Sequence, residues 1–207
     1  MLRLARALLG VCLALVSTSA RAQLSRDATD LRGHVSPTPA WLPRGIFLGA
    51  QFNNGAIIPN LHLQWELTLF QDRKDAWIAI LDGGVGWAAS LPDTALSRVN
   101  LDLPVTSYYE HTLQAGFGYR NHLPGKIHWG FQVTAGPTFY GAHFTTQPPD
   151  RRVAGTVQGR FQLGYQLPRD VGVGVAVNYA EPFGLKNRSL ARDFVGGVNV
   201  GFFADWR

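Results

Sequence analysis

The sequence predicts an all-β fold, an eight-stranded antiparallel up-and-down transmembrane β-barrel formed by residues 45–207. Polar and apolar residues alternate through most of this region, and a period of two is typical of strands whose two faces meet different surroundings. The longest alternating runs exceed the ~9–11 residues with which a tilted strand crosses a bilayer, whereas soluble strands average roughly 5–6 residues. Past the leader, no apolar run approaches the roughly 20 residues of a membrane helix, so a membrane location would require a closed barrel.

The first 22 residues are predicted to be a secretory signal peptide. Arg3 and Arg6 form a basic start, residues 7–16 are an apolar run, and residues 20–22 give a small-residue cleavage site. The single cysteine, Cys12, lies inside this leader, so the mature chain should have no disulfide and no cysteine metal ligand. Lipidation of Cys12 stays open as an alternative.

Residues 23–44 are polar and proline-containing at their end, and they are predicted to be a periplasmic N-terminal extension without regular structure. The chain carries a formal charge of +5, of which the three arginines of the leader supply three, so the mature chain retains +2. No basic run is interleaved with aromatic residues, and a nucleic-acid partner is therefore not predicted.

The first four predicted strands cover residues 45–52, 60–70, 76–89 and 108–120. Each has one apolar and one polar face. The apolar faces carry, in chain order, Ile46, Leu48, Ala50 and Phe52, then Leu61, Leu63, Trp65, Leu67 and Leu69, then Trp77, Ala79, Leu81, Val85 and Trp87, and then Tyr109, His111, Leu113, Ala115, Phe117 and Tyr119.

The last four predicted strands cover residues 127–140, 154–167, 171–179 and 193–206. Their apolar faces carry Ile127, Trp129, Phe131, Val133, Ala135, Pro137 and Phe139, then Val157, Phe161, Leu163, Tyr165 and Leu167, then Val171, Val173, Val175, Val177 and Tyr179, and then Phe194, Val198, Val200, Phe202, Ala204 and Trp206. Short connections follow the second, fourth and sixth strands, and longer ones follow the other strands, at 141–153 and 180–192 for example. This alternation is typical of bacterial barrels, which have short periplasmic turns and longer extracellular loops.

The polar faces indicate which side of the wall faces lipid. A soluble barrel would present a surface on which about 25–35% of residues are charged, but these faces are mostly Gln, Thr, Gly, Asn and His. Their few charged members are Glu66, Asp82, Glu110, Arg120 and Arg160. Such a set suits the narrow lumen of an eight-stranded barrel, so the apolar faces are predicted to contact lipid.

Aromatic residues are expected to form a girdle at each membrane interface. In the hairpin of strands 108–120 and 127–140, Tyr109 and Phe139 lie at the open end and Tyr119 and Trp129 lie at the turn end. The turn is therefore predicted to face the periplasm.

The signal peptide, the eight long strands, the girdles and the C-terminal strand ending at residues 201–207 resemble the small outer-membrane barrels of the OmpA/OmpX type. The resemblance covers residues 45–207. It departs from that family at the end of the chain, where Trp206 is followed by Arg207 instead of a terminal phenylalanine. It implies a monomer in the bacterial outer membrane that is placed there by the barrel insertion machinery and has no cofactor.

The five charged lumen residues are predicted to form an ion-paired, hydrogen-bonded network that plugs the barrel, since buried charges must be paired. Arg160 is the expected hub because it is the only basic lumen residue near the middle of a strand. A path for protons or ions, or binding and passage of small amphipathic molecules, is the alternative. The favoured function is a structural or surface-interaction role in the outer membrane.

Basic residues of two predicted outer loops are candidates for contact with lipopolysaccharide, because guanidinium groups pair well with phosphate. They are Arg151 and Arg152 in one loop and Lys186, Arg188 and Arg192 in the other. An ordinary solvated loop is the alternative.

An enzyme that modifies lipid A would need a nucleophile, a base and an acid together. Glu110 and His111 are adjacent in a strand and face opposite ways, and Ser107 and His111 are separated by roughly 13 Å along it. The deacylases of the resembling barrels carry a His-x-Ser pair, whereas His143 is followed by phenylalanine and threonine. No catalytic residue is therefore predicted. No metal site is predicted either, because His62 and His128 share the lumen without a third ligand.

Overall fold

A computed structural model describes residues 41–53, 55–71, 75–89, 91, 105–123, 126–145, 148–168, 171–184 and 194–206. The predicted signal peptide and the predicted extension before residue 41 lie outside these ranges. No helix within the described ranges is long and apolar enough to cross a membrane.

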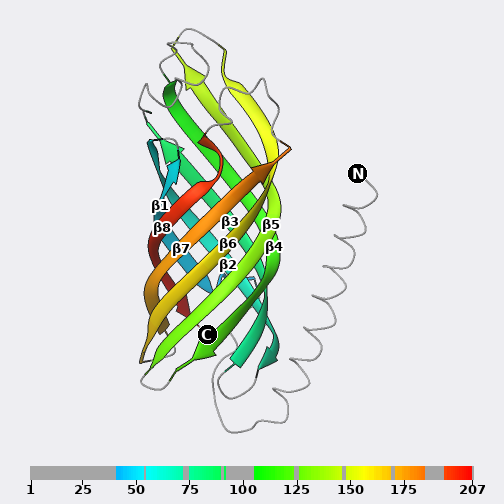
Figure 1. The fold of residues 1–207 in the computed structure, drawn as a ribbon, viewed down its shortest axis with the longest axis vertical. Coiled ribbons are helices and arrows are strands. Elements are labelled where there is room, and N and C mark those ends of the chain that lie inside the picture. Colours follow the sequence, from blue (N-terminus) through cyan, green and yellow to red (C-terminus); the bar gives the residue numbers. More distant parts are fainter. Residues whose placement is uncertain are drawn as a thin grey trace, which may run out of the picture.

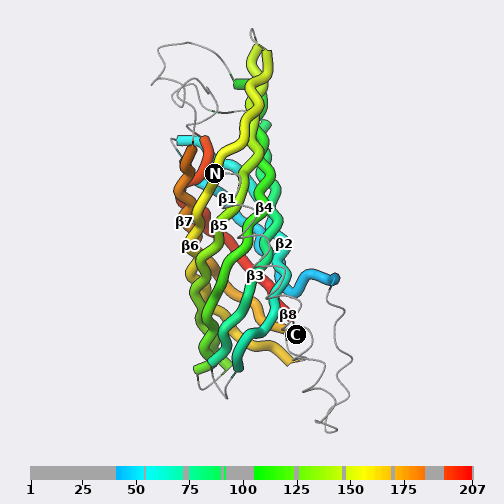
Figure 2. Tube along the Cα trace, turned by 90° about the vertical axis from the view of Figure 1, so that its right-hand side faces the viewer, coloured from blue at the N-terminus to red at the C-terminus, as the bar shows by residue number. Residues whose placement is uncertain are grey.

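The described chain is a closed antiparallel barrel of eight strands, which confirms the predicted fold class (Figure 1). The strands are β1 (Gly45–Asn53), β2 (Ala56–Gln71), β3 (Asp75–Ala88), β4 (Val105–His122), β5 (Ile127–Phe144), β6 (Asp150–Leu167), β7 (Val171–Phe183) and β8 (Gly197–Trp206). Each pairs with the next in sequence, and β1 pairs with β8 to close the wall. Strands β5 and β6 rise above their neighbours at one end, and the C-terminal end of β8 lies at the other (Figure 2).

Alternation along each strand separates a polar interior from an apolar exterior. In β4, Leu113 is 52% exposed and Phe117 is 51% exposed, whereas Gln114 between them is 1% exposed. The outward-facing apolar side chains cover the wall, as the alternation predicts.

A ladder of aromatic rings crosses the outer surface of β3 to β6 near the turn between β4 and β5. The ring centroids of Trp77 and Tyr119 are 5.3 Å apart, those of Tyr119 and Trp129 are 5.6 Å apart, and those of Trp129 and Phe161 are 6.3 Å apart. Trp87 lies further along β3, opposite Tyr109 of β4. At a rise of about 3.4 Å per residue and a tilt of about 40°, positions 77 and 87 are separated by roughly 25 Å along the barrel axis, the height of an outer-membrane apolar band.

The connection between β1 and β2 is much shorter than predicted. Asn53 pairs with Ala56, so only two residues separate the paired ends of the two strands. Gly55 has a φ of 82°, a left-handed conformation that tight hairpins of this length require. Strand β2 therefore starts before residue 60, and the rule of longer connections on this side fails for the first hairpin.

The predicted outer loop at residues 141–153 is mostly strand. Strand β5 continues to Phe144, and β6 starts at Asp150. Tyr140, Ala142 and Phe144 alternate into the barrel and are buried there, so the upper lumen is apolar. Because every lumen face is expected to be polar, the sequence predicts a loop where both faces are apolar. Arg151 and Arg152 therefore belong to β6 and not to the predicted loop.

Strand β8 starts four positions later than predicted, and Phe194 is not on the lipid-facing wall. Gly196 and Gly197 have φ values of 77° and 104°, which bend the chain between the barrel mouth and the wall. Phe194 is 0% exposed, and its ring meets that of Tyr108 at 5.5 Å.

An apolar cluster, here called the outer plug, fills the lumen beneath this bend. Its members are Ala56, Ile58, Ala88, Leu91, Val105, Tyr108, Tyr140, Ala142, Phe144, Ala154, Phe194 and Val195. Gln51 Nε2 donates to the carbonyl of Phe194 at 3.1 Å, and Asn53 Nδ2 donates to that of Val195 at 3.1 Å. These bonds fix the segment before β8 to β1.

Candidate functional site

Arg160 occupies the middle of the lumen and connects strands on different sides of it. Its Nε donates to Asn178 Oδ1 at 3.0 Å, Nη1 donates to Gln64 Oε1 at 2.9 Å, and Nη2 donates to Asp82 Oδ2 at 3.2 Å. The guanidinium carbon also lies 5.0 Å from the centre of the Phe47 ring. One side chain of β6 thus contacts β1, β2, β3 and β7, and it is 5% exposed.

Asp82 of β3 contacts His62 as well as Arg160. His62 Nδ1 lies 2.7 Å from Asp82 Oδ1, and both side chains are buried. Gly84, two residues further along β3, makes room for this ring, because a Cβ there would lie 2.6 Å from it. The sequence names Asp82 and His62 as lumen residues, but it does not indicate that they meet.

A separate ion-paired layer lies toward the end that carries the β4–β5 turn. Arg120 Nη2 is 2.8 Å from Glu66 Oε1 and 3.1 Å from Asp205 Oδ2. His128 Nε2 is 4.0 Å from the same Asp205 oxygen. Asp205 is absent from the predicted network, although the alternation of β8 places it on the lumen face opposite Ala204 and Trp206.

Glu110 lies apart from both ion-paired layers. Its Oε2 accepts a hydrogen bond from Tyr108 Oη at 3.0 Å, and the residue is 5% exposed. No arginine, lysine or histidine nitrogen lies within 4.0 Å of its carboxylate within the part of the chain that the structure describes. Glu110 therefore lies in the lumen and is held there by a hydrogen bond, and it takes part in no ion pair among the described residues.

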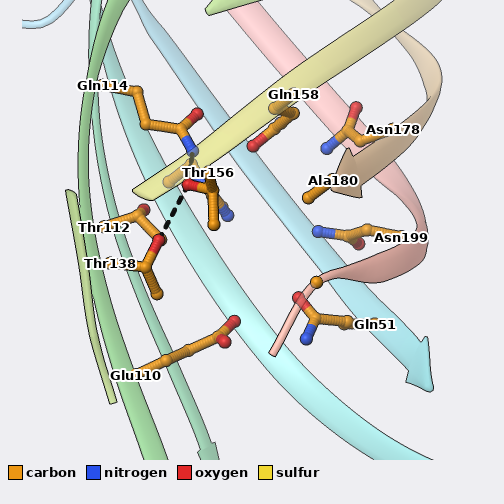
Figure 3. Close-up of a pocket in the computed structure, with 12 residues that line it drawn as sticks. Gln51, Glu110, Thr112, Gln114, Thr138, Thr156, Gln158, Asn178, Ala180 and Asn199 are labelled. Atoms are coloured by element: carbon orange, nitrogen blue, oxygen red, sulfur yellow. Dashed lines mark hydrogen bonds between the residues drawn. The ribbon is translucent and has the colours of Figure 1, made fainter. Parts of the chain in front are cut away.

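A small polar cavity of about 20 Å³ separates the Arg160 layer from the outer plug. It is lined by Gln51, His62, Glu110, Thr112, Gln114, Thr138, Thr156, Gln158, Asn178, Ala180, Gly196 and Asn199, ten of which are labelled in Figure 3. Thr156 Oγ1 accepts from Gln114 Nε2 at 2.8 Å and lies 2.9 Å from Thr138 Oγ1. The space suffices for one or two water-sized particles, because one water needs ~10–15 Å³.

The residues predicted to contact lipopolysaccharide divide into two groups. Arg151 is exposed and pairs with Gly141 of β5. The partner of Gly141 on the other side is Tyr109 of β4, which belongs to the aromatic girdle at the open end of the hairpin, here called the upper girdle. Arg152 is bound through Nε to Asp150 Oδ1 at 3.0 Å. Lys186, Arg188 and Arg192 lie outside the described residues.

The residues considered for catalysis meet in a way that the sequence does not reveal. Ser107 of β4 pairs with His143 of β5, and the rings of Tyr109 and His143 are 6.1 Å apart. No hydrogen bond joins Ser107 to the His143 ring, and no carboxylate from the described ranges contacts that ring. Glu110 faces the lumen, so no carboxylate of the described residues is placed to orient the base.

No three His, Cys, Asp or Glu side chains of the described residues are arranged to bind a metal ion. The predicted pair, His62 and His128, is divided between the two ion-paired layers, since one contacts Asp82 and the other lies beside Asp205.

Neither a protein-family model nor a curated protein matches the chain. Among solved structures, it is similar to the outer membrane enzyme PagL, with 14% identity, a TM-score of 0.51, and coverage of 79% of this chain and 99% of PagL. The fold is that of the small bacterial outer-membrane barrels. Ail, the attachment invasion locus protein of Yersinia pestis, aligns at 10% identity and a TM-score of 0.47, over 78% of this chain and 93% of Ail.

Proposed function

We propose that this protein is an integral outer-membrane barrel with a structural or surface-interaction role and a lumen closed to solutes. The apolar outer wall supports membrane insertion, because large side chains such as Leu113, Phe117 and Phe202 are exposed on it. The roughly 25 Å between the aromatic girdles matches the apolar band of outer-membrane barrels.

The filling of the lumen by side chains is the observation that supports this proposal. Arg160 bridges the lumen at mid-height, Arg120 bridges it below, and the outer plug fills it above. The cavity left between plug and Arg160 is about 20 Å³, which is far smaller than the ~300 Å³ or more of a typical small-molecule site. This favours a structural role over passage of ions or amphipathic molecules.

Conductance in planar lipid bilayers tests the proposal. The purified full-length mature protein should give no discrete conductance steps at neutral pH, while a porin inserted under the same conditions gives them. Reproducible steps from the wild type that change amplitude in Arg160→Ala would overturn the closed lumen and favour a channel.

The surface partner that we propose is the phosphate of lipopolysaccharide. Arg151 projects from β6 beside the Tyr109–Gly141 pair of the upper girdle, where lipid headgroups would lie. Replacing Arg151, Arg152, Lys186, Arg188 and Arg192 by glutamine should reduce co-purifying lipopolysaccharide several-fold. Arg44→Gln, which changes one charge beside the opposite end of the barrel, should leave it unchanged. Equal lipopolysaccharide in the five-fold variant and the wild type would exclude this contact.

The pairing of Ser107 with His143 favours a second candidate, a lipid A acyl hydrolase on the outer wall. Expression of the wild type would then remove an acyl chain from the lipid A mass spectrum, and Ser107→Ala would restore it. The structural role predicts the same spectrum with and without the protein.

A further inference from the structure

Glu110 is a buried carboxylate whose charge the lumen arginines do not balance. Arg120 contacts Glu66 and Asp205, and Arg160 contacts Asp82, which leaves Glu110 without an arginine partner among the described residues. A buried carboxylate must be paired, bind a cation or take up a proton, because an isolated buried charge costs several kcal/mol.

One hydrogen bond reaches the Glu110 carboxylate from a buried hydroxyl. Tyr108 Oη donates to Oε2 at 3.0 Å. Gln51 Nε2 donates to the carbonyl of Phe194 in the outer plug. A donated hydrogen bond stabilises a carboxylate. A cation beside Glu110 would balance the charge that the arginines leave unpaired.

The space and the further ligands for a cation are present beside this carboxylate. Glu110, Thr112 and Asn199 line the same cavity of about 20 Å³ (Figure 3). Thr112 Oγ1 and Asn199 Oδ1 are buried and have no hydrogen-bond partner among the residues that the structure describes, and Asn199 is 5% exposed. Gly86 leaves room for the Glu110 side chain, because a Cβ there would lie 2.9 Å from Glu110 Cγ and 3.0 Å from Oε1.

We propose that Glu110 anchors a binding site for one small monovalent cation of the medium, Na⁺ or K⁺, with neutral oxygen ligands from Thr112 and Asn199. Hard cations take carboxylate, amide and hydroxyl oxygens, and sites for Ca²⁺ usually collect several carboxylates. Here one carboxylate faces the cavity, which balances one positive charge. His62 also lines the cavity, but its Nδ1 is bound to Asp82. The outer plug covers the site, so the ion would be enclosed as the barrel folds.

Refolding in different salts tests this site. The mature protein is refolded into detergent micelles at pH 7.5 and equal ionic strength in NaCl, KCl or N-methylglucamine chloride, and the midpoint of heat-modifiable gel migration is measured. Na⁺ or K⁺ should raise the midpoint above that in N-methylglucamine, since a cation at ten times its Kd multiplies the folded-to-unfolded ratio by about eleven. Equal midpoints in the three salts would overturn the proposal.

Matched variants locate the effect. Glu110→Gln keeps the size of the side chain and should abolish the difference between salts, and Thr112→Val should reduce it. Glu181→Gln removes an exposed carboxylate that accepts from Tyr179 and should keep the difference. If Glu110→Gln does not fold, ²³Na NMR replaces the comparison of midpoints. The wild type should broaden the ²³Na resonance, and Thr112→Val should not. A difference that persists in Glu110→Gln, or a stronger response to micromolar Ca²⁺ than to Na⁺ or K⁺, would contradict a monovalent site at Glu110.

Discussion

Arg160 holds the centre of the lumen because its planar guanidinium reaches acceptors on three other strands at once. Asp82, its ionic partner, would remain buried beside His62 if the arginine were removed. Breaking a buried pair on one side is costlier than replacing both partners, because the remaining charge keeps its desolvation penalty.

Arg160→Ala should therefore lower the free energy of unfolding by about 3 kcal/mol, in the range measured when one partner of a buried ion pair is removed. Urea unfolding of the barrel in lipid vesicles, followed by tryptophan fluorescence, measures the change. Arg151→Ala, at an exposed position of the same strand, should stay within about 0.5 kcal/mol of the wild type. A loss below 1 kcal/mol in Arg160→Ala would show that the pairing does not stabilise the fold.

The strands follow from alternation wherever one face meets lipid and the other meets polar side chains. The β4–β5 hairpin is predicted well because Leu113, Gln114 and Phe117 have the contrasting exposures that their polarity implies. Alternation fails where both faces are apolar, as at Ala142 and Phe144. Alternation also fails at Gly196 and Gly197. Their left-handed backbone bends the chain so that Phe194 lies inside the barrel mouth, although the apolar alternation of the sequence continues through Phe194.

Phe194 gives the element-scale prediction. A cysteine at position 194 should react at least tenfold more slowly with a charged maleimide than one at position 123, because Phe194 is buried in the outer plug and Leu123 is exposed at the opposite turn. The predicted mature chain has no cysteine of its own, so each variant carries a single thiol. Similar rates at the two positions would show that the plug does not cover the mouth.

At the scale of the whole molecule, the sequence predicts the number of strands, their antiparallel order and which face turns outward. It does not predict which lumen side chains meet, because contacts across a barrel depend on its closure and stagger and not on local periodicity. Glu110 and Arg160 share the lumen face, but the closed barrel places them in different layers. In the same way, Ser107 and His143 meet only through the register of β4 and β5.

The central claim, a closed barrel in the outer membrane, is tested most directly by fractionating cells that express the full-length chain and comparing gel migration with and without boiling. The protein should be found with the outer-membrane fraction, and the unboiled barrel should migrate faster than the boiled chain. Recovery in the soluble periplasm, with migration that boiling does not change, would contradict the claim.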